Sequence, residues 1–478
     1  MKKSVAVVGV VLAGAVAYGV SSWYVGQRAQ DHIETAVVEG NSRLGKVLGE
    51  ELSTQPVQLS ISRYDRGWFS SSIIYSLKLT GSGGEITEFL LADKLQHGPF
   101  PWSAVRQGDL SPVLAISQAT LIPSAGSQRW FDALDGRSPL SILSRIGFSG
   151  AGQSDWHFEP VDFTTDTDAK VAFGGGHLKM VYAAGLAAIT SRGDFPSLSV
   201  NLPEAESFSL QKVVVDKAYS FEGNQAATIR VDIGQTLYTG ADDDKVRLDA
   251  FSMVGESAQN NGLFDGSARY EVQALHSANI NLGKVSAAFQ VNRLDLKAFQ
   301  ALTSQYDTIL SEQGLSDDDM ADLDDSDVLR LREHLFELLK SKPSLALDPF
   351  TWDNGAGQSR LSAKFDFVRP DFALIDAPSD ELLMQAIGQV DVSASVSKTM
   401  FARLYAQMMS GTEDEEPSNA MARMLFDMYA GTLTRTGLAS YVDGVLGSAV
   451  RYKDGQVVVN GKSYTIDEFL EQLSLSDL

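Results

Sequence analysis

The 478-residue chain contains no cysteine. This absence excludes disulfides, thiolate nucleophiles, iron–sulfur clusters and cysteine-based zinc sites together. Positive charge is also scarce, because 39 lysines and arginines stand against 61 aspartates and glutamates, a formal net charge of -22. Phosphate binding requires clustered positive charge, so we expect no binding of nucleic acid. The fractions of hydrophobic residues, 44%, and of charged residues, 21%, are typical of a folded globular protein.

The chain also lacks a local motif for catalysis, a cofactor or a metal. Gly461-Lys462-Ser463 is similar to the end of a phosphate-binding loop, but Gln456 occupies a position where such a loop requires glycine. Residues 316–327 contain seven aspartates without the glycine and glutamate of an EF-hand, so we interpret them as a connector between helices. The histidines are too dispersed for a local metal motif: His32, His97, His157, His177, His276 and His334.

We therefore expect no metal, no cofactor and a function that is not enzymatic, because function must be argued from a site and no local site is visible. A hydrolase whose catalytic residues come from distant positions is the weaker alternative. The class of protein that remains is one that binds a ligand or a partner.

The first part of the chain has the pattern of a membrane anchor. Two lysines precede an uncharged stretch, Ser4 to Gln27, which is long enough to cross a bilayer as a helix. Trp23 and Tyr24 would lie at the headgroup level, and the lysines favour a cytoplasmic N-terminus. We therefore predict a single-pass transmembrane segment, with the rest of the chain outside the cytoplasm. The alternative is a signal peptide that is cleaved after Ala17.

Beyond this segment the hydrophobic period changes twice. Helical spacing continues to residue 52, then apolar and polar residues alternate to residue 291, as in antiparallel strands, and amphipathic helices join the strands after that. We predict a mainly β fold with α, an elongated antiparallel β body with a helix-rich α+β C-terminal third. The predicted regions are a transmembrane anchor at 1–27, a stalk or docking helix at 28–52, an antiparallel β-rich region at 53–291 and a mixed α+β region at 292–478.

Two local signals predict particular turns and caps. Asp65-Arg66-Gly67 separates two alternating runs, which predicts a hairpin turn with Gly67 at a positive φ. Thr465 and Glu468 have the spacing of a capping box, which predicts the start of the last helix.

Methionines are concentrated in one predicted pair of helices. Six of the eleven lie there: Met400, Met408, Met409, Met421, Met424 and Met428. Core packing is the ordinary role of such residues, but flexible thioethers also line surfaces that accept varied apolar ligands. Met400, Met408, Met424 and Met428 are therefore candidate residues of an apolar groove or a partner-binding face.

Several strings along the whole chain resemble the YdgA-like family of bacterial envelope proteins, a domain of unknown function. They are Trp23-Tyr24-Val25-Gly26, the hairpin Tyr64 to Ser71, the loop His97 to Pro101, Ser144 to Gly150, and Asp454 to Leu470. The resemblance implies a Gram-negative inner-membrane anchor with a periplasmic body, and it supplies no reaction, ligand or catalytic residue. The acidic stretch 316–327 is not a feature that we associate with the family.

Among these segments, His97-Gly98-Pro99-Phe100-Pro101 is the strongest candidate for a binding site. An imidazole beside two prolines and an aromatic ring is rigidly held and could recognise a ligand. Arg66 in the hairpin turn could face it. The alternative is that the segment 97–101 and the turn at Arg66 serve only to form turns, with Pro99 and Pro101 ending a strand. The candidate ligand or partner residues of this region are Arg66, Trp68, Phe69, His97, Pro99 and Phe100.

We expect a membrane-anchored envelope protein with one of two mechanisms. In the first, curved sheets with one apolar face shelter a lipid or another apolar ligand in a β-lined groove. In the second, the body is filled solidly and its loops bind an envelope protein or a second copy of the chain, as in an assembly or scaffold protein.

Overall fold

A computed structural model describes residues 21–474 apart from 42–56, 81–85, 204–205, 242–243, 279, 314–324, 372, 374, 376 and 411–415. The chain forms two compact units. Unit 1 comprises Met1–Gly223, Ile229–Gly234 and Thr239–Ala241, and unit 2 comprises Asn224–Thr228, Gln235–Tyr238 and Asp242–Leu478. Strand β12 (Gln225–Thr239) contributes residues to both.

Unit 1 is a helix at residues 21–41 followed by a bent antiparallel sheet. Its strands are β1 (Val57–Arg66), β2 (Ser70–Thr80), β3 (Ile86–His97), β4 (Ala115–Ile122), β5 (Leu140–Ile146), β6 (Gly152–Phe158), β7 (Val161–Thr164), β8 (Lys170–Phe173), β9 (Gly176–Tyr182), β10 (Ala188–Asn201) and β11 (Ser207–Ser220). Short helices α3 (Trp102–Arg106), α4 (Gln128–Ala133) and η1 (Ala184–Leu186) lie in the connections. Antiparallel pairing runs β1–β2–β3–β4–β5–β6–β9–β10–β11, and β8 pairs with both β7 and β10.

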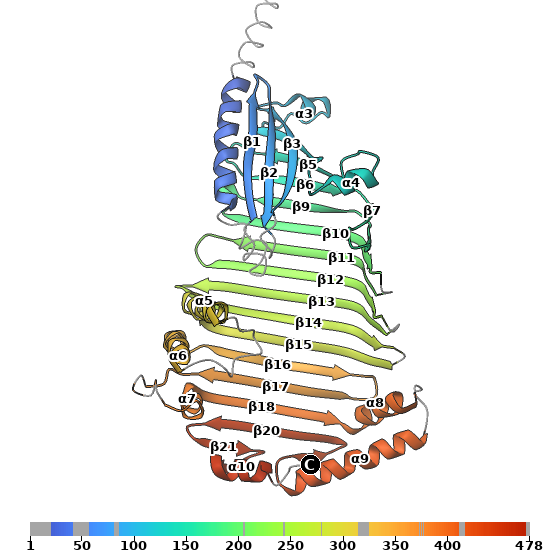
Figure 1. The fold of residues 1–478 in the computed structure, drawn as a ribbon, viewed down its shortest axis with the longest axis vertical. Coiled ribbons are helices and arrows are strands. Elements are labelled where there is room, and N and C mark those ends of the chain that lie inside the picture. Colours follow the sequence, from blue (N-terminus) through green and yellow to red (C-terminus); the bar gives the residue numbers. More distant parts are fainter. Residues whose placement is uncertain are drawn as a thin grey trace, which may run out of the picture. The chain divides into compact units, whose positions relative to one another are not determined.

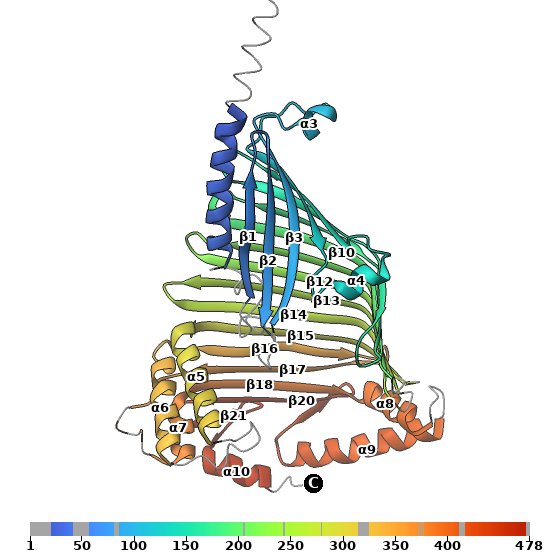
Figure 2. The same ribbon diagram turned by 45° about the horizontal axis from the view of Figure 1, so that its top comes forward.

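The sheet of unit 1 turns through a large angle along this order. Strands β1 to β3 stand upright in Figure 1, whereas β6, β9 and β10 lie across the view. When the molecule is turned, β1 to β3 lie in front of β10 (Figure 2). The sheet of unit 1 is therefore strongly bent, and its bend gives it a concave side.

Alternation explains the two faces of the strands. In β4, Gln118 and Thr120 are exposed while Ala119 and Leu121 are buried, because successive side chains of a strand point to opposite faces. A buried cluster joins the strands to the N-terminal helix: it contains Val25, Ala29, Ile33, Ile73, Leu95, Leu114 and Ala115. Because Val25, Ala29 and Ile33 recur every four residues, they form one face of the helix and pack on the sheet.

Unit 2 is an antiparallel meander with helices in its connections. Its strands are β13 (Lys245–Asn260), β14 (Leu263–Ser277), β15 (Ile280–Asp295), β16 (Ser344–Asp353), β17 (Gln358–Phe367), β18 (Ile387–Ser397), β19 (Ser440–Val442), β20 (Val445–Lys453), β21 (Gln456–Val459) and β22 (Lys462–Thr465). Pairing follows chain order from β13 to β18, continues with β20, β21 and β22, and adds β19 beside β20.

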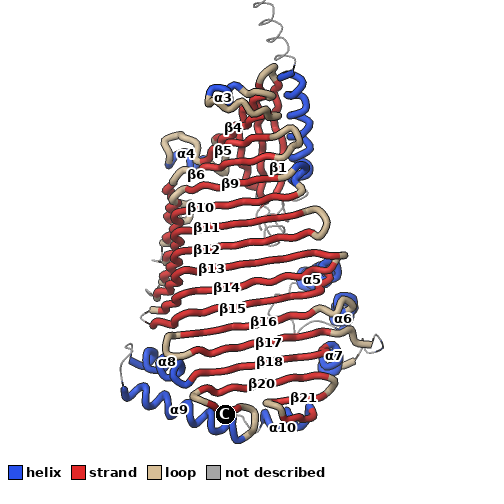
Figure 3. Tube along the Cα trace, turned by 180° about the vertical axis from the view of Figure 1, so that it is seen from behind, coloured by secondary structure: helices blue, strands red, loops and turns tan. Residues whose placement is uncertain are grey.

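The helices of unit 2 lie at the ends of these strands. They are α5 (Leu296–Gln313), α6 (Asp325–Leu339), α7 (Ser379–Ala386), α8 (Lys398–Ser410), α9 (Glu416–Arg435) and α10 (Ile466–Ser474). Figure 3 shows α5, α6 and α7 at one edge of the meander and α8 and α9 at the other. Three of them follow a strand directly: α5 follows β15, α8 follows β18 and α10 follows β22.

The predicted mainly β, antiparallel fold with a mixed C-terminal part is confirmed. The hairpin turn lies where predicted, since Asp65 pairs with Ser72, but Gly67 does not have a positive φ. Glycine is required there because a Cβ would lie 2.8 Å from the carbonyl oxygen of Ser70. The predicted capping box is confirmed: Glu468 N–H donates to Thr465 Oγ1 at 3.2 Å, and Thr465 N–H donates to Glu468 Oε2 at 2.8 Å.

Three predictions fall partly outside the described residues. Among the residues that the structure describes, no helix is both long and apolar enough to span a membrane. Residues 4–20 of the predicted anchor and 42–52 of the predicted stalk helix are not among them. Of the acidic stretch 316–327, predicted to connect two helices, only the last three residues are described, and they form the start of α6.

Candidate ligand-binding cavity

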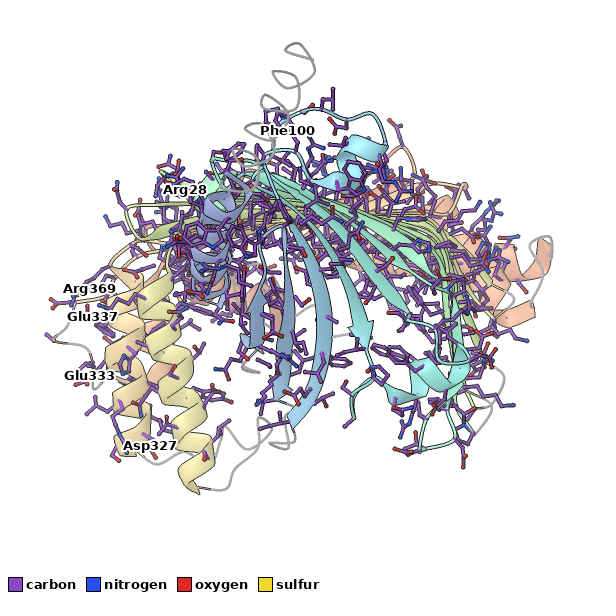
Figure 4. The ribbon with its side chains drawn as sticks, turned by 90° about the horizontal axis from the view of Figure 1, so that it is seen from above. Arg28, Phe100, Asp327, Glu333, Glu337 and Arg369 are labelled. Carbon is purple, nitrogen blue, oxygen red and sulfur yellow. The ribbon has the colours of Figure 1, made fainter. Side chains whose placement is uncertain are left out.

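Unit 1 contains a partly open cavity of about 740 Å³, within the range of roughly 300–1,000 Å³ that is typical of small-molecule sites. Its lining comes from the N-terminal helix, from strands of unit 1 between β1 and β9, and from Trp130 of α4 and Pro139 in a connection. Most lining side chains are apolar, among them Leu77, Leu91, Leu121, Ile142, Trp156 and Phe158. The strands of unit 1 curve when viewed from above (Figure 4).

The period-two pattern of the strands explains why the wall is apolar. On β3 the residues that line the cavity are Phe89, Leu91, Asp93 and Leu95, every second residue of the strand. On β4 they are Ser117, Ala119 and Leu121. One face of each strand is therefore presented to the cavity.

A row of polar side chains crosses this wall. It consists of Tyr75, Asp93, Ser117, Ser144, Ser154 and Tyr182, and we call it the polar row. Ser117 is the cross-strand partner of Ser144, and Ser144 is the partner of Ser154. Antiparallel register thus aligns three serines from three strands. The other charged lining residue, Glu159, is partly exposed and lies 3.3 Å from His157 Nε2.

Hydrogen bonds connect the polar row. Ser117 Oγ donates to Asp93 Oδ1 at 2.8 Å, and Tyr75 Oη donates to Asp93 Oδ2 at 3.5 Å. Ser144 Oγ and Ser154 Oγ lie 2.7 Å apart, and Ser154 also hydrogen-bonds Tyr182. Burial raises the pKa of Asp93, although Ser117 and the backbone of Gln118 stabilise the carboxylate. Burial likewise raises the pKa values of Tyr75 and Tyr182.

The cavity adjoins a smaller hollow under the N-terminal helix. This hollow has a volume of about 330 Å³ and shares Ile33, Ile146 and Tyr182 with the main cavity. Because Ile33 is a helix residue, the helix forms part of the wall of both spaces.

The predicted string at His97 is a structural support and not part of the cavity wall. His97 is buried, and Ser71 Oγ lies 2.8 Å from its Nε2. The ring also touches the N-terminal helix, since a Cβ on Gly26 would lie 2.4 Å from His97 Nδ1. Gly26 is therefore the residue that allows the helix to approach the strands closely.

The remaining residues of this candidate group lie at the end of unit 1 near His97. Arg66 faces the N-terminal helix, with its guanidinium 5.7 Å from the centroid of the Trp23 ring. Trp68 and Phe69 are exposed, and Phe100 lies beside α3 (Figure 4) and is 39% exposed. The structure thus brings Arg66, Trp68, Phe69, His97, Pro99 and Phe100 to one region of unit 1, away from the residues that line the cavity.

Burial of His97 predicts a pH dependence of the stability of unit 1. Burial lowers the pKa of His97 below its usual 6.5, so the unfolded chain takes up the proton first. The stability contribution is complete above about pH 6.5 and is lost as the pH falls through the folded-state pKa. Hydrogen exchange at pH 7.5 and pH 5.5, corrected for the intrinsic exchange rate at each pH, should show lower protection of unit 1 at pH 5.5, and His97→Gln should weaken this difference.

The matched control is His32→Gln, because His32 is exposed on the N-terminal helix. It should leave the pH dependence unchanged. Asp93 has the opposite effect on stability. Its pKa is raised in the folded state, so the folded chain takes up the proton first and unit 1 gains stability as the pH falls towards 3.8. Equal slopes in His97→Gln and the unaltered chain would contradict the assignment to His97.

The methionine candidates divide into buried and exposed residues. Met400 on α8 is buried, and Ser359 Oγ donates to its sulfur at 3.0 Å. Met408, Met424 and Met428 are exposed, as are Met409 and Met421, so core packing holds for Met400 alone of this group. The helical pair α8–α9 therefore presents a methionine-rich face on unit 2.

Two other groupings were not visible in the sequence. His157 and His177 are cross-strand partners with their Nδ1 atoms 3.3 Å apart, although the histidines are too dispersed in the sequence for a local metal motif. Within the described ranges, no group of three or more side chains suited to a metal is found. Unit 2 has a polar hollow of about 650 Å³, in which Arg360 pairs with Asp348 and Arg451 with Asp391.

Comparison with known proteins places the chain in a family. The model of a bacterial protein family of unknown function, DUF945, matches residues 1–467. Protein YdgA of Escherichia coli is 24% identical over 503 aligned residues that cover 100% of this chain and 98% of the relative. The uncharacterized protein YihF of the same organism is 21% identical over 480 residues, 97% of each chain.

An uncharacterized protein of Haemophilus influenzae is 23% identical over 324 residues, 63% of this chain and 85% of the relative. No solved structure matches the chain. The resemblance to YdgA-like proteins that the sequence motifs indicated is thus confirmed over the whole length. The chain belongs to the DUF945 family of bacterial proteins of unknown function.

Proposed function

We propose that unit 1 binds a lipid or another ligand with a long apolar part in its cavity, and that a membrane anchor holds the protein in the bacterial envelope. The observation that carries this proposal is the cavity of about 740 Å³ behind a largely apolar wall. Protein interiors are ordinarily close-packed, so a space of this size in the middle of an apolar face favours an occupant. The role proposed is binding and not catalysis.

Lipid analysis of the purified full chain tests this proposal. The protein is extracted in detergent, and the lipids that remain bound are identified by mass spectrometry. We expect one class of acyl-bearing molecule in a defined ratio to protein, because a cavity of fixed volume holds a fixed number of chains. A spectrum with no bound lipid, or with lipids in the proportions of the membrane, would contradict ligand binding in the cavity.

We place the body on the periplasmic side of the inner membrane, tethered by the uncharged residues before the N-terminal helix. Exposed apolar side chains at one end of unit 1 support a membrane contact. They are Trp23, Tyr24, Trp68, Phe69, Phe100, Trp102 and Leu110. Figure 1 shows α3 and the turn after β1 at the same end of unit 1 as the start of the described helix. Aromatic rings of this kind favour the headgroup level.

Spin labels can measure the depth of this end in a bilayer. The chain has no cysteine, so Trp68→Cys and Trp102→Cys each provide a single labelling site in the full-length protein. We expect labels at both positions to be more accessible to oxygen than to a water-soluble nickel complex in reconstituted vesicles. Asp132→Cys on α4 is the control and should show the opposite. Water-like accessibility at Trp68 and Trp102 would place this end away from the lipid.

Binding of a protein partner is the second candidate function. The observation that favours it is the methionine-rich face of α8–α9, where Met408 is 66% and Met424 is 74% exposed. Flexible thioethers suit an apolar surface that adapts to a protein. The partner would be an envelope protein or a second copy of the chain. A lipid spectrum without bound acyl chains would favour this candidate.

A further inference from the structure

We propose that the polar row selects a neutral amphiphile, such as a long-chain alcohol or monoester, and rejects fatty acid anions. The hydroxyl or ester group would hydrogen-bond at Asp93 and Ser117, and the hydrocarbon chain would lie along the apolar wall. This inference rests on the proposed binding of an apolar ligand and specifies the chemistry of its head group.

The placement of the row sets the direction of the ligand. On each of the four strands β3 to β6, two apolar residues beyond the polar row line the cavity on the side of Leu91. The outermost of these residues are Phe89, Leu121, Leu140 and Phe158. Because cavity-facing residues are every second residue of a strand, the outermost of the two lies about 13 Å from the polar row. On the other side, Leu95 and Ile146 with Ile33 of the helix follow directly. The longer apolar part therefore lies on the Leu91 side, where the chain of an amphiphile would extend.

Asp93 has capacity for one more hydrogen bond. The carboxylate accepts from Ser117 Oγ at 2.8 Å and from the backbone N–H of Gln118, whereas Tyr75 Oη is 3.5 Å from Oδ2, at the upper limit for such a bond. A carboxylate has about four acceptor sites, so one remains for a ligand. A ligand hydroxyl could donate to Oδ2 at a shorter distance. If Asp93 is protonated, it could instead donate to an ester carbonyl, since a carboxylic acid has one O–H donor. Both protonation states accommodate a neutral head group.

The charge of Asp93 opposes an anionic head group. Within the described residues, no lysine, arginine or histidine forms an ion pair with Asp93, which is only 5% exposed. A fatty acid carboxylate at the row would place two like charges together in a poorly solvated space. One of the two would have to take up a proton, at a cost in binding free energy. A neutral hydroxyl or ester meets no such cost.

Competition between ligands of equal chain length tests the selection. The full chain in detergent is incubated at pH 7 with equal amounts of dodecanol, dodecylamine and dodecanoate, and bound species are counted by native mass spectrometry. We expect dodecanol to exceed dodecanoate by at least tenfold. Asp93→Asn keeps the shape of the side chain but removes its charge, and should reduce this ratio to near one. Ser60→Ala, a change on β1 away from the row, should keep the ratio.

The outcomes separate the two proposals. If none of the three probes binds, the proposed function fails. If all three bind equally, or if dodecanoate or dodecylamine dominates, the cavity binds apolar ligands but the selection for a neutral head group is wrong. An unchanged ratio in Asp93→Asn would also overturn the inference, because the selection would then not depend on the charge of Asp93.

Discussion

Tryptophan in place of Ala119 is expected to lower the affinity of the full chain for a long-chain alcohol by at least tenfold. Ala119 is buried on β4 and lines the cavity directly beside the polar row. An indole at this position would project into the space that the hydrocarbon chain is proposed to fill. Two displaced methylenes would forfeit about 1.6 kcal/mol, and about 1.4 kcal/mol corresponds to a tenfold change in affinity.

The adjacent residue provides a matched control. Thr120 lies on the same strand but is exposed on the opposite face, so Thr120→Trp adds the same side chain outside the cavity. Displacement of a fluorescent fatty alcohol measures both variants, and circular dichroism shows whether each is folded. Retained binding in Ala119→Trp, in a folded protein, would mean that the ligand does not occupy this cavity.

Much of the architecture could be predicted from local patterns. Alternation of apolar and polar residues predicted antiparallel strands between residues 53 and 291, the region that contains β4, and the Thr465–Glu468 spacing predicted the start of α10. These features depend on neighbours within a few residues of one another. Gly67 shows the limit: the turn was predicted, but the reason for glycine is a close approach to the carbonyl oxygen of Ser70, which only the folded backbone reveals.

The cavity could not be predicted in the same way. Its polar row depends on register between strands that are far apart in the sequence, as in the pairing of Ser117 with Ser144. One signal was present: Asp93 stands at a position of β3 where Phe89, Leu91 and Leu95 set an apolar alternation. A charged residue on an otherwise apolar strand face indicates either an error of register or a functional position. The structure assigns Asp93 to the cavity wall.

The methionines show a second limit of sequence patterns. Helical spacing identifies the residues that share a face, but it does not say whether that face is covered. Met400 packs against β17 through Ser359, whereas Met424 on α9 is exposed. Met408 lies on the same helix as Met400 and is also exposed, so the difference arises from where each residue lies relative to the sheet. A pattern of apolar residues thus predicts a helix more securely than it predicts a buried core.

Alanine substitutions at two glycines of the N-terminal helix are expected to have opposite effects on its stability. Both lie within residues 21–41, where alanine favours the helix over glycine by about 0.5–1 kcal/mol. A Cβ on Gly40 would meet no atom within 4 Å, so Gly40→Ala should gain this amount. A Cβ on Gly26 would lie 2.4 Å from the buried ring of His97, which hydrogen-bonds Ser71. We expect Gly26→Ala to destabilise the packed helix by about 1–3 kcal/mol.

Hydrogen exchange of peptides from residues 21–41 measures both effects in the full chain. Exchange should be slower in Gly40→Ala and faster in Gly26→Ala than in the unaltered protein, and His97→Ala combined with Gly26→Ala should restore part of the protection. Because Ile33 of the same helix lines the cavity, a displaced helix should also weaken ligand binding. Equal protection in the two glycine variants would show that the close contact between Gly26 and His97 does not determine the stability of the helix. The position of Ile33 in the cavity wall would then depend on other contacts of the helix.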